Sequence, residues 1–273
     1  MTRRLAFPLA LATLFAPPAF APAAAAEPSF DCRTAQTARE LAICDDAKLA
    51  AADRELAAAW REAIARLDPA TAKALREDQR KFLSDIDDGF DAELWGKQER
   101  PEGKELRAQV AQLRRGGDYD VLASLEAQLR ERIAFLRNLT PAASFAGLWK
   151  NHDSELLLAA AGNSRYRATY GTTSFGWAKY HCHFTAEFGA SGGSDKGLAA
   201  PAAHNTDPEV DENTASTLFM SRSGATLTLS ERIPDNVGDA PLRRICPRGG
   251  DFADPFFHTG LRADDARRLR PEE

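Results

Sequence analysis

The sequence predicts an α+β protein in which an antiparallel helical bundle is followed by a small antiparallel β-barrel or sandwich. Apolar residues recur with a period of about 3.6 as far as Thr140, whereas beyond Pro141 the period is about 2 and glycine is frequent. The 273 residues are 44% hydrophobic and 27% charged, which is typical of a folded chain with one or two domains. We therefore expect a signal peptide over residues 1–26, a helical domain over 27–140 and a disulfide-bridged β domain over 141–273.

Residues typical of helix N-termini predict the first two helices. Thr37 and Glu40 have the spacing of a capping box, which satisfies two free amides, and the helix is expected to run to about Cys44. Either Asp45 or Asp46 can cap the next helix. The apolar residues of that second helix recur at helical spacing and are Leu49, Ala52, Leu56, Trp60, Ile64 and Leu67.

A third helix is predicted to open at Asp68-Pro69, because proline is favoured at the first helical position, where its missing amide costs nothing. We expect a less regular stretch over residues 88–117, with a short helix over 102–115. The last helix should open at Asp118 or Asp120 and end before Pro141.

Alternating apolar and polar residues predict the strands of the second half. Gly162-Asn163 tolerates the positive φ of a hairpin turn, and a second hairpin is expected across residues 222–224. The segment 189–213 is too long for a simple connection, so we interpret it as either a functional or a disordered loop. The expected strands are residues 155–161, 165–170, 180–188, 215–220, 225–232 and 252–259.

The N-terminal residues predict export. Arg3 and Arg4 precede a mostly apolar run over residues 5–20 and an alanine-rich stretch that ends at Ala26, as in a cleavable secretory signal peptide. Proline interrupts the apolar run, which is too short for a membrane anchor, and no cysteine follows in a lipidation context. We therefore expect a periplasmic or secreted protein. Its charge after cleavage would be 33 minus 40, or -7, which makes nucleic acid an unfavourable partner.

Four cysteines in an oxidising compartment predict disulfides. Four cysteines allow three connectivities, and pairing within each half would join Cys32 to Cys44 and Cys182 to Cys246. The rival interpretation is a metal site around His181-Cys182-His183. It is disfavoured because alternate residues of a strand point to opposite faces and could not converge on one ion.

No catalytic motif is recognisable, so we expect no catalytic residues, no cofactor and no metal. The sequence contains no Gly-x-Ser-x-Gly, His-Glu-x-x-His, phosphate-loop or Gly-x-Gly-x-x-Gly pattern. A pair of carboxylates brought together by folding would leave no local pattern, so hydrolysis by two acids stays open. The acidic run Asp85, Asp87, Asp88 and Asp91 lacks the glycine and the closing glutamate of a calcium loop, and we interpret it as a solvated helix end.

The first half resembles the N-terminal domain of LprI-type lysozyme inhibitors over about residues 30–90. The resemblance is carried by a Glu-x-x-Ile-Cys pattern after an upstream cysteine, and by a Gln-Arg-x-aromatic-Leu pattern one helix later. It implies scaffold roles for these residues, with Cys32–Cys44 stapling the first helix and Arg80 able to pair across the helices with an acid such as Asp53. The family-motif residues are Glu40, Ile43, Asp53, Gln79, Arg80 and Phe82.

The second half is loosely similar to the small periplasmic β domains of lysozyme inhibitors of the membrane-bound C-type group. The loop with Arg222, Ser223 and Gly224 carries this resemblance, which implies that these residues contact a partner. Both resemblances together imply an exported inhibitor that occludes the cleft of a lysozyme-like glycosidase. The alternatives are a non-catalytic envelope scaffold that binds peptidoglycan or another envelope protein, and a hydrolase that uses carboxylates.

Overall fold

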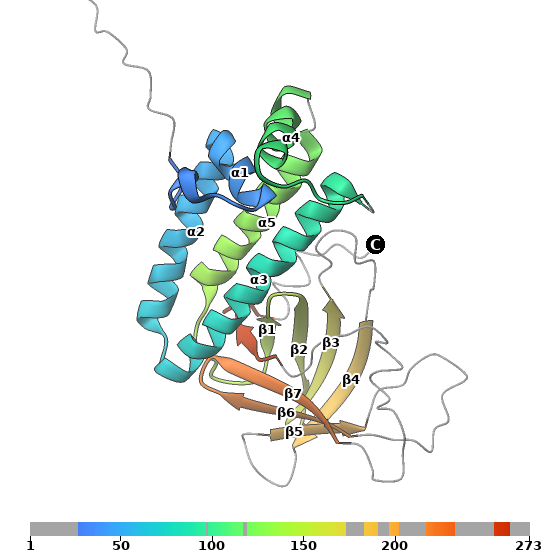
Figure 1. Ribbon diagram of the computed structural model, residues 1–273. Helices are drawn as coiled ribbons and strands as arrows, with labels where there is room; N and C mark the ends of the chain where they lie inside the picture. Colours follow the sequence, from blue (N-terminus) through green and yellow to red (C-terminus); the bar gives the residue numbers. More distant parts are fainter. Residues whose placement is uncertain are drawn as a thin grey trace, which may run out of the picture.

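The computed structural model describes residues 27–96, 98–116, 119–172, 183–190, 197–201, 217–232 and 254–262, and it shows five α-helices followed by a β-barrel (Figure 1). A short 3₁₀ turn, Cys32–Thr34, precedes the first α-helix. The helices are α1 (Ala38–Asp45), α2 (Ala47–Arg66), α3 (Pro69–Trp95), α4 (Gly103–Gly116) and α5 (Tyr119–Asn138). The α+β fold class is confirmed.

The predicted helix starts are confirmed. The Thr37 side chain accepts a hydrogen bond from the Glu40 amide, and the Glu40 carboxylate accepts one from the Thr37 amide at 3.1 Å, which completes the capping box of α1. Of the two candidate caps for α2, Asp46 is the one that accepts from the first-turn amides. Asp68 caps α3, with Pro69 at its start.

The predicted irregular stretch from residue 88 is wrong, because α3 continues to Trp95. The apolar period continues through Ile86 and Phe90, and both side chains are buried in the helical core. The acidic residues in this part of α3 are therefore inside a helix and not at a solvated end. Two of them are paired with cations from other segments, Asp87 with Arg39 of α1 at 2.9 Å and Asp91 with Arg100 at 3.2 Å.

The helical core is formed where α2 packs against α5, and where α1 packs against α2, α3 and α4. Its largest fully buried side chains include Phe82, Leu75 and Leu129. The C-terminal end of α5 is bound by Arg66 of α2, whose guanidinium donates to the carbonyl oxygens of Leu136 and Arg137. Those carbonyls have no partner within their own helix, so a cation from a neighbouring helix stabilises this end of α5.

The second part is a closed antiparallel barrel, which decides between the predicted barrel and the predicted sandwich. Each strand pairs with the next, and β8 pairs with both β7 and β1. Its interior is apolar and includes stacked Tyr170 and Phe184 rings with centroids 4.9 Å apart. The strands are β1 (Gly147–Lys150), β2 (Ser154–Gly162), β3 (Arg165–Thr172), β4 (His183–Ala190), β5 (Gly197–Pro201), β6 (Thr217–Ser223), β7 (Thr226–Arg232) and β8 (Phe256–His258).

The details of the barrel differ from the prediction in several places, beginning with β1, which was not among the expected strands. Residues 189–213 are not simply a loop, because β4 extends to Ala190 and β5 lies within this segment, paired with β4 and β6. The second hairpin turns at Gly224-Ala225, so Arg222 and Ser223 are the last residues of β6. The first hairpin is confirmed, but its turn is shifted by one residue to Asn163 and Ser164, with φ of 49° and 56°, and Gly162 is the last residue of β2. The predicted Cys182–Cys246 bridge and His181 lie outside the described residues.

The helices and the barrel share packed contacts. Phe257 of β8 belongs to the helical core, where its ring meets the edge of Phe135 of α5 at a centroid distance of 6.2 Å. The connection after α5 is held in the same place, because the Thr140 amide donates to the carbonyl oxygen of His258. Figure 1 shows the barrel against the lower ends of α3 and α5. None of the described helices is long and apolar enough to cross a bilayer.

The Cys32–Cys44 disulfide is confirmed, and it generates the first testable prediction. Replacing both cysteines with serine should lower the free energy of unfolding by about 3 kcal/mol, because the bridge restricts a short loop of the unfolded chain. Urea unfolding followed by circular dichroism measures this. An unchanged free energy of unfolding, with the same helix content in the folded state, would show that the bridge is dispensable.

Candidate functional site

The proposed partner-binding residues lie at the tip of the β6–β7 hairpin, which is packed against the helices. Ser223 and Gly224 are exposed, and Gly224 has a φ of +58°, which favours glycine. A Cβ at Gly224 would lie 3.5 Å from Oδ2 of Asp68, the residue that caps α3. The Gly224 carbonyl oxygen accepts from the Ala142 amide at 3.3 Å, so the hairpin tip is fixed in place by the segment between helices and barrel.

Arg222 is directed into the protein and not toward solvent. Its Nη1 donates to the carbonyl oxygen of Ala142 at 2.5 Å, and its guanidinium lies 5.7 Å from the ring centroid of Phe145. Its buried Nε has no hydrogen-bond partner among the described residues. These contacts assign Arg222 to holding the hairpin, and leave Ser223 and Gly224 as the accessible part of the predicted triplet.

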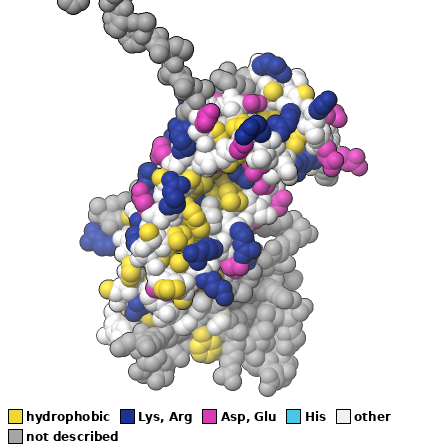
Figure 2. All heavy atoms as spheres, turned by 60° about the vertical axis from the view of Figure 1, so that its left-hand side comes forward, with side chains coloured by type: hydrophobic (Ala, Val, Ile, Leu, Met, Phe, Trp, Pro, Cys, Tyr) yellow, Lys and Arg dark blue, Asp and Glu magenta, His cyan; other side chains and the backbone are white. Residues whose placement is uncertain are grey.

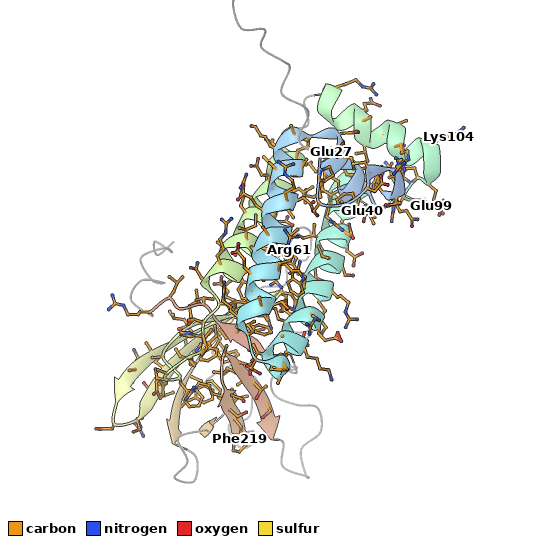
Figure 3. The ribbon with its side chains drawn as sticks, turned by 90° about the vertical axis from the view of Figure 1, so that its left-hand side faces the viewer. Glu27, Glu40, Arg61, Glu99, Lys104 and Phe219 are labelled. Atoms are coloured by element: carbon orange, nitrogen blue, oxygen red, sulfur yellow. A yellow bond between two sulfur atoms is a disulfide. The ribbon has the colours of Figure 1, made fainter. Side chains whose placement is uncertain are left out.

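The family-motif residues of the helical part are structural in their contacts. Glu40 completes the capping box, and Ile43 is fully buried in the helical core. Asp53 of α2 is also buried and accepts from the Ser29 amide at 2.6 Å, which holds the N-terminal segment against α2. Figure 3 shows Glu40 toward the end of the bundle that is remote from the barrel, with Phe219 on the barrel at the opposite end.

The expected pair between Arg80 and Asp53 is wrong. Arg80 pairs with Glu77 one turn earlier on the same helix, and both side chains are exposed. Asp53 is buried and accepts a hydrogen bond from the N-terminal segment, whereas Arg80 is exposed to solvent. The two side chains therefore have different surroundings and different partners. An exposed pair at this spacing contributes little to stability, about 0.3–0.5 kcal/mol.

The buried charge pair of the bundle is formed by Asp78 of α3 and Arg132 of α5. Arg132 Nη2 donates to Asp78 Oδ2 at 2.6 Å, and each side chain is only 3% exposed. Arg132 Nε donates to Oε1 of the motif residue Gln79 at 2.9 Å. The guanidinium lies between two aromatic rings, 4.7 Å from the centroid of Phe82 and 4.4 Å from that of Phe135.

This pair also reaches the barrel. The second oxygen of Asp78 accepts from the backbone amide of His152, in the turn between β1 and β2, at 2.7 Å. Asp78 thus receives hydrogen bonds from α5 and from the barrel at once, and its charge is compensated on both sides. The pair therefore fixes α3 relative to both of its neighbours.

The protonation of Asp78 follows from these contacts. Burial would raise the pKa of this carboxyl group, but the charge of Arg132 and the hydrogen bonds from His152 and Arg132 outweigh it and hold the pKa below its usual value. Burial lowers the pKa of Arg132, and the Asp78 carboxylate opposes that shift. The site is an ion pair that is charged near neutral pH.

The sequence contains a signal for this pair that motif reading missed. Asp78 lies three residues after Leu75 and four before Phe82, so it occupies the apolar face of α3. Arg132 is similarly placed three residues after Leu129 and next to Ile133. A charged residue on the apolar face of each of two helices predicts a buried pair, because an isolated buried charge is too costly to tolerate.

The comparisons with known proteins agree with the architecture of the helical part. Residues 31–136 match the family model of lysozyme inhibitor LprI. The LprI match extends beyond the resemblance seen in the sequence and includes both Asp78 and Arg132, whereas the whole barrel lies outside it. The comparison with curated proteins and the comparison with solved structures gave no match. Within the described part of the chain, no group of histidine, cysteine and acidic side chains is arranged to hold a metal ion.

The second prediction concerns the buried pair of the LprI-matching segment. Changing Asp78→Asn should lower the free energy of unfolding by about 3–5 kcal/mol, because it leaves Arg132 buried without its counter-charge. The double variant Asp78→Leu with Arg132→Met should recover part of this loss, since neither charge is then buried. Chemical unfolding of the three proteins measures both effects.

A neighbouring residue provides the matched control. Arg80→Ala removes the exposed charge two positions after Asp78 and should change the free energy of unfolding by less than about 0.5 kcal/mol. Equal effects of the Asp78 and Arg80 variants would contradict the assignment of the buried pair.

Proposed function

We propose that this protein is an exported, non-catalytic inhibitor that binds a lysozyme-like glycosidase and occludes its cleft. The observation that carries the proposal is the match of residues 31–136 to the LprI lysozyme inhibitor family, over a segment that folds as a disulfide-stapled helical bundle. The signal-like N-terminal sequence, Arg3-Arg4 and then apolar and alanine-rich residues, supports export. A protein that binds lysozyme in the cell envelope would have to be exported to reach it.

We propose the tip of the β6–β7 hairpin as part of the contact surface. Its exposed Ser223 and Gly224 lie beside Asp68 at the start of α3, so the accessible surface there combines the barrel and the LprI-matching bundle. Arg222 and the Gly224 carbonyl hold the hairpin in place. Because the tip is already ordered, binding a partner would cost less conformational entropy. Ser223 can donate a hydrogen bond to a carboxylate of the partner, whereas Arg222 positions the tip.

Charge would direct the approach of a basic partner. The chain carries 35 basic and 40 acidic residues, a net charge of -5, which favours association with a basic enzyme at low ionic strength. On the helical face drawn in Figure 2, Lys and Arg side chains are interspersed with Asp and Glu side chains around an apolar band. Because that face carries both signs of charge, it would not by itself direct a basic enzyme.

The proposal predicts dose-dependent inhibition of cell-wall lysis by the full mature chain. Lysozymes of several types should be assayed with bacterial cell walls over a range of salt concentrations, and association should slow as salt rises. The whole chain is the right material, because cutting between bundle and barrel would separate Asp78 from the His152 amide. Absence of inhibition by the oxidised full chain for every lysozyme type would contradict the proposal. Capture of an envelope protein without inhibition would then favour the scaffold function.

A bulky substitution at the hairpin tip tests the contact surface. Ser223→Trp should weaken inhibition at least tenfold, which is about 1.4 kcal/mol of binding free energy, while the fold is retained because Ser223 is exposed. Ser230→Trp is the matched control. Ser230 is exposed on the same hairpin and lies about four residues, or ~13 Å, along β7 from Thr226, the residue opposite Ser223. Equal inhibition by both variants would show that the hairpin tip is not part of the contact surface.

A further inference from the structure

The turn between β1 and β2 places an imidazole among carboxylates of both parts of the protein. His152 is only 7% exposed. Its Nδ1 lies 3.4 Å from Oδ1 of Asp78 and 3.7 Å from Oδ2 of Asp254, and its Nε2 lies 3.7 Å from Oδ2 of Asp85. Asp78 and Asp85 belong to α3, whereas Asp254 precedes β8, so the ring is at the junction of bundle and barrel.

This geometry requires a proton to be shared within the site. An ionised carboxylate only accepts hydrogen bonds, and a neutral imidazole has one nitrogen that carries a proton and one that does not. Both nitrogens of His152 face carboxylate oxygens. In the neutral ring, the lone pair of the unprotonated nitrogen would therefore point at a lone pair of a carboxylate oxygen. The imidazolium form presents an N–H and a positive charge in each direction, at ion-pair distances of 3.4–3.7 Å, although Nδ1 makes no direct hydrogen bond among the described residues.

Other charges around the ring are in place to balance it. Lys81 of α3 pairs with Asp254 at 2.5 Å, and Arg132 of α5 pairs with the far oxygen of Asp78. Asp153 adjoins His152 in the same turn. With Asp153, four acids stand against two fixed cations, so a proton on His152 adds a third positive charge to a cluster that is otherwise negative. The resulting cluster joins α3, α5 and the barrel.

We propose that His152 is a proton-operated clasp between the helical bundle and the barrel, closed when the imidazole is protonated and loosened when it is neutral. The clasp is independent of whether the protein inhibits a glycosidase. It acts at one side of the junction, while Phe135 and Phe257 hold the other side at any pH. Loss of the proton therefore weakens the contact locally without separating the two parts.

The direction of the pH effect follows from the environment of the ring. Burial would lower the pKa of His152, but the contact with Asp78 and the charges of Asp153, Asp78 and Asp85 raise it above the ordinary value of 6.5. A raised folded-state pKa contributes stability that is fully present below the unfolded pKa, and this stability is lost as the pH rises through the folded pKa. Burial also raises the pKa of Asp85 from 3.8, with the charges of Asp153, Asp88 and Asp78 acting in the same direction and that of His152 opposing them.

The test uses the full chain in two measurements. Nuclear magnetic resonance of the wild-type histidine ring, assigned by its absence in His152→Gln, should show titration above 6.5. Amide hydrogen exchange in the β1–β2 turn and in the middle of α3, corrected for the intrinsic pH dependence of exchange, should quicken together through the same pH range. His152→Gln should remove the fall in the folding equilibrium constant that accompanies a rise of the pH above 6.5.

His258 is the matched control because burial lowers its pKa, so its contribution to stability has the opposite sign and is lost as the pH falls. His258→Gln should leave the fall above neutral pH in place. Should His152→Gln not fold, the wild-type titration and Asp85→Asn, which should lower the pKa of His152, still decide the question. Titration of His152 below 6.5, or an unchanged pH dependence in His152→Gln, would overturn the clasp.

Discussion

The structure depends on one buried ion pair, Asp78 with Arg132, more than on any other polar contact described. Two charges removed from water are tolerated only if their hydrogen-bonding groups are satisfied, and here those partners come from three different elements. The guanidinium donates to Gln79 and contacts two aromatic rings, and the second carboxylate oxygen accepts from the His152 amide. A shift of α3, α5 or the β1–β2 turn would leave a buried group unpaired. The pair thus selects one arrangement from the many that apolar packing alone would allow.

Much of the fold could be predicted from local signals, because those signals act over a few residues. A capping box, an aspartate before proline and a change of period from about 3.6 to 2 determined helix starts and the place where strands begin. The sequence predicts too early an end for α3, because the acidic run from Asp85 has the composition of a solvated helix end. Arg39 and Arg100, which pair with Asp87 and Asp91, lie on other segments and could not be assigned to the run by spacing.

The candidate site, like the fold, could be predicted from the sequence only in part. The resemblance drew attention to Arg80 as a charged motif residue, yet its side chain is exposed, while the neighbouring Asp78 and Gln79 bind Arg132. The pairing across 54 residues follows from which helix faces meet, and helical period alone could show only that each residue lay on an apolar face. Likewise, a hairpin near residues 222–224 was predictable, but the inward direction of Arg222 depended on the position of Ala142 and Phe145.

The closure of the barrel restricts how this protein can meet other macromolecules. Because β8 bonds to both β7 and β1, the described strands close into a barrel, which shortens the strand edges along which another chain could add a strand. Recognition through the paired part of the barrel would therefore use side chains and turns, which read shape and charge, and not the backbone, which accepts almost any extended peptide. The same closure limits the template on which exposed sheets aggregate.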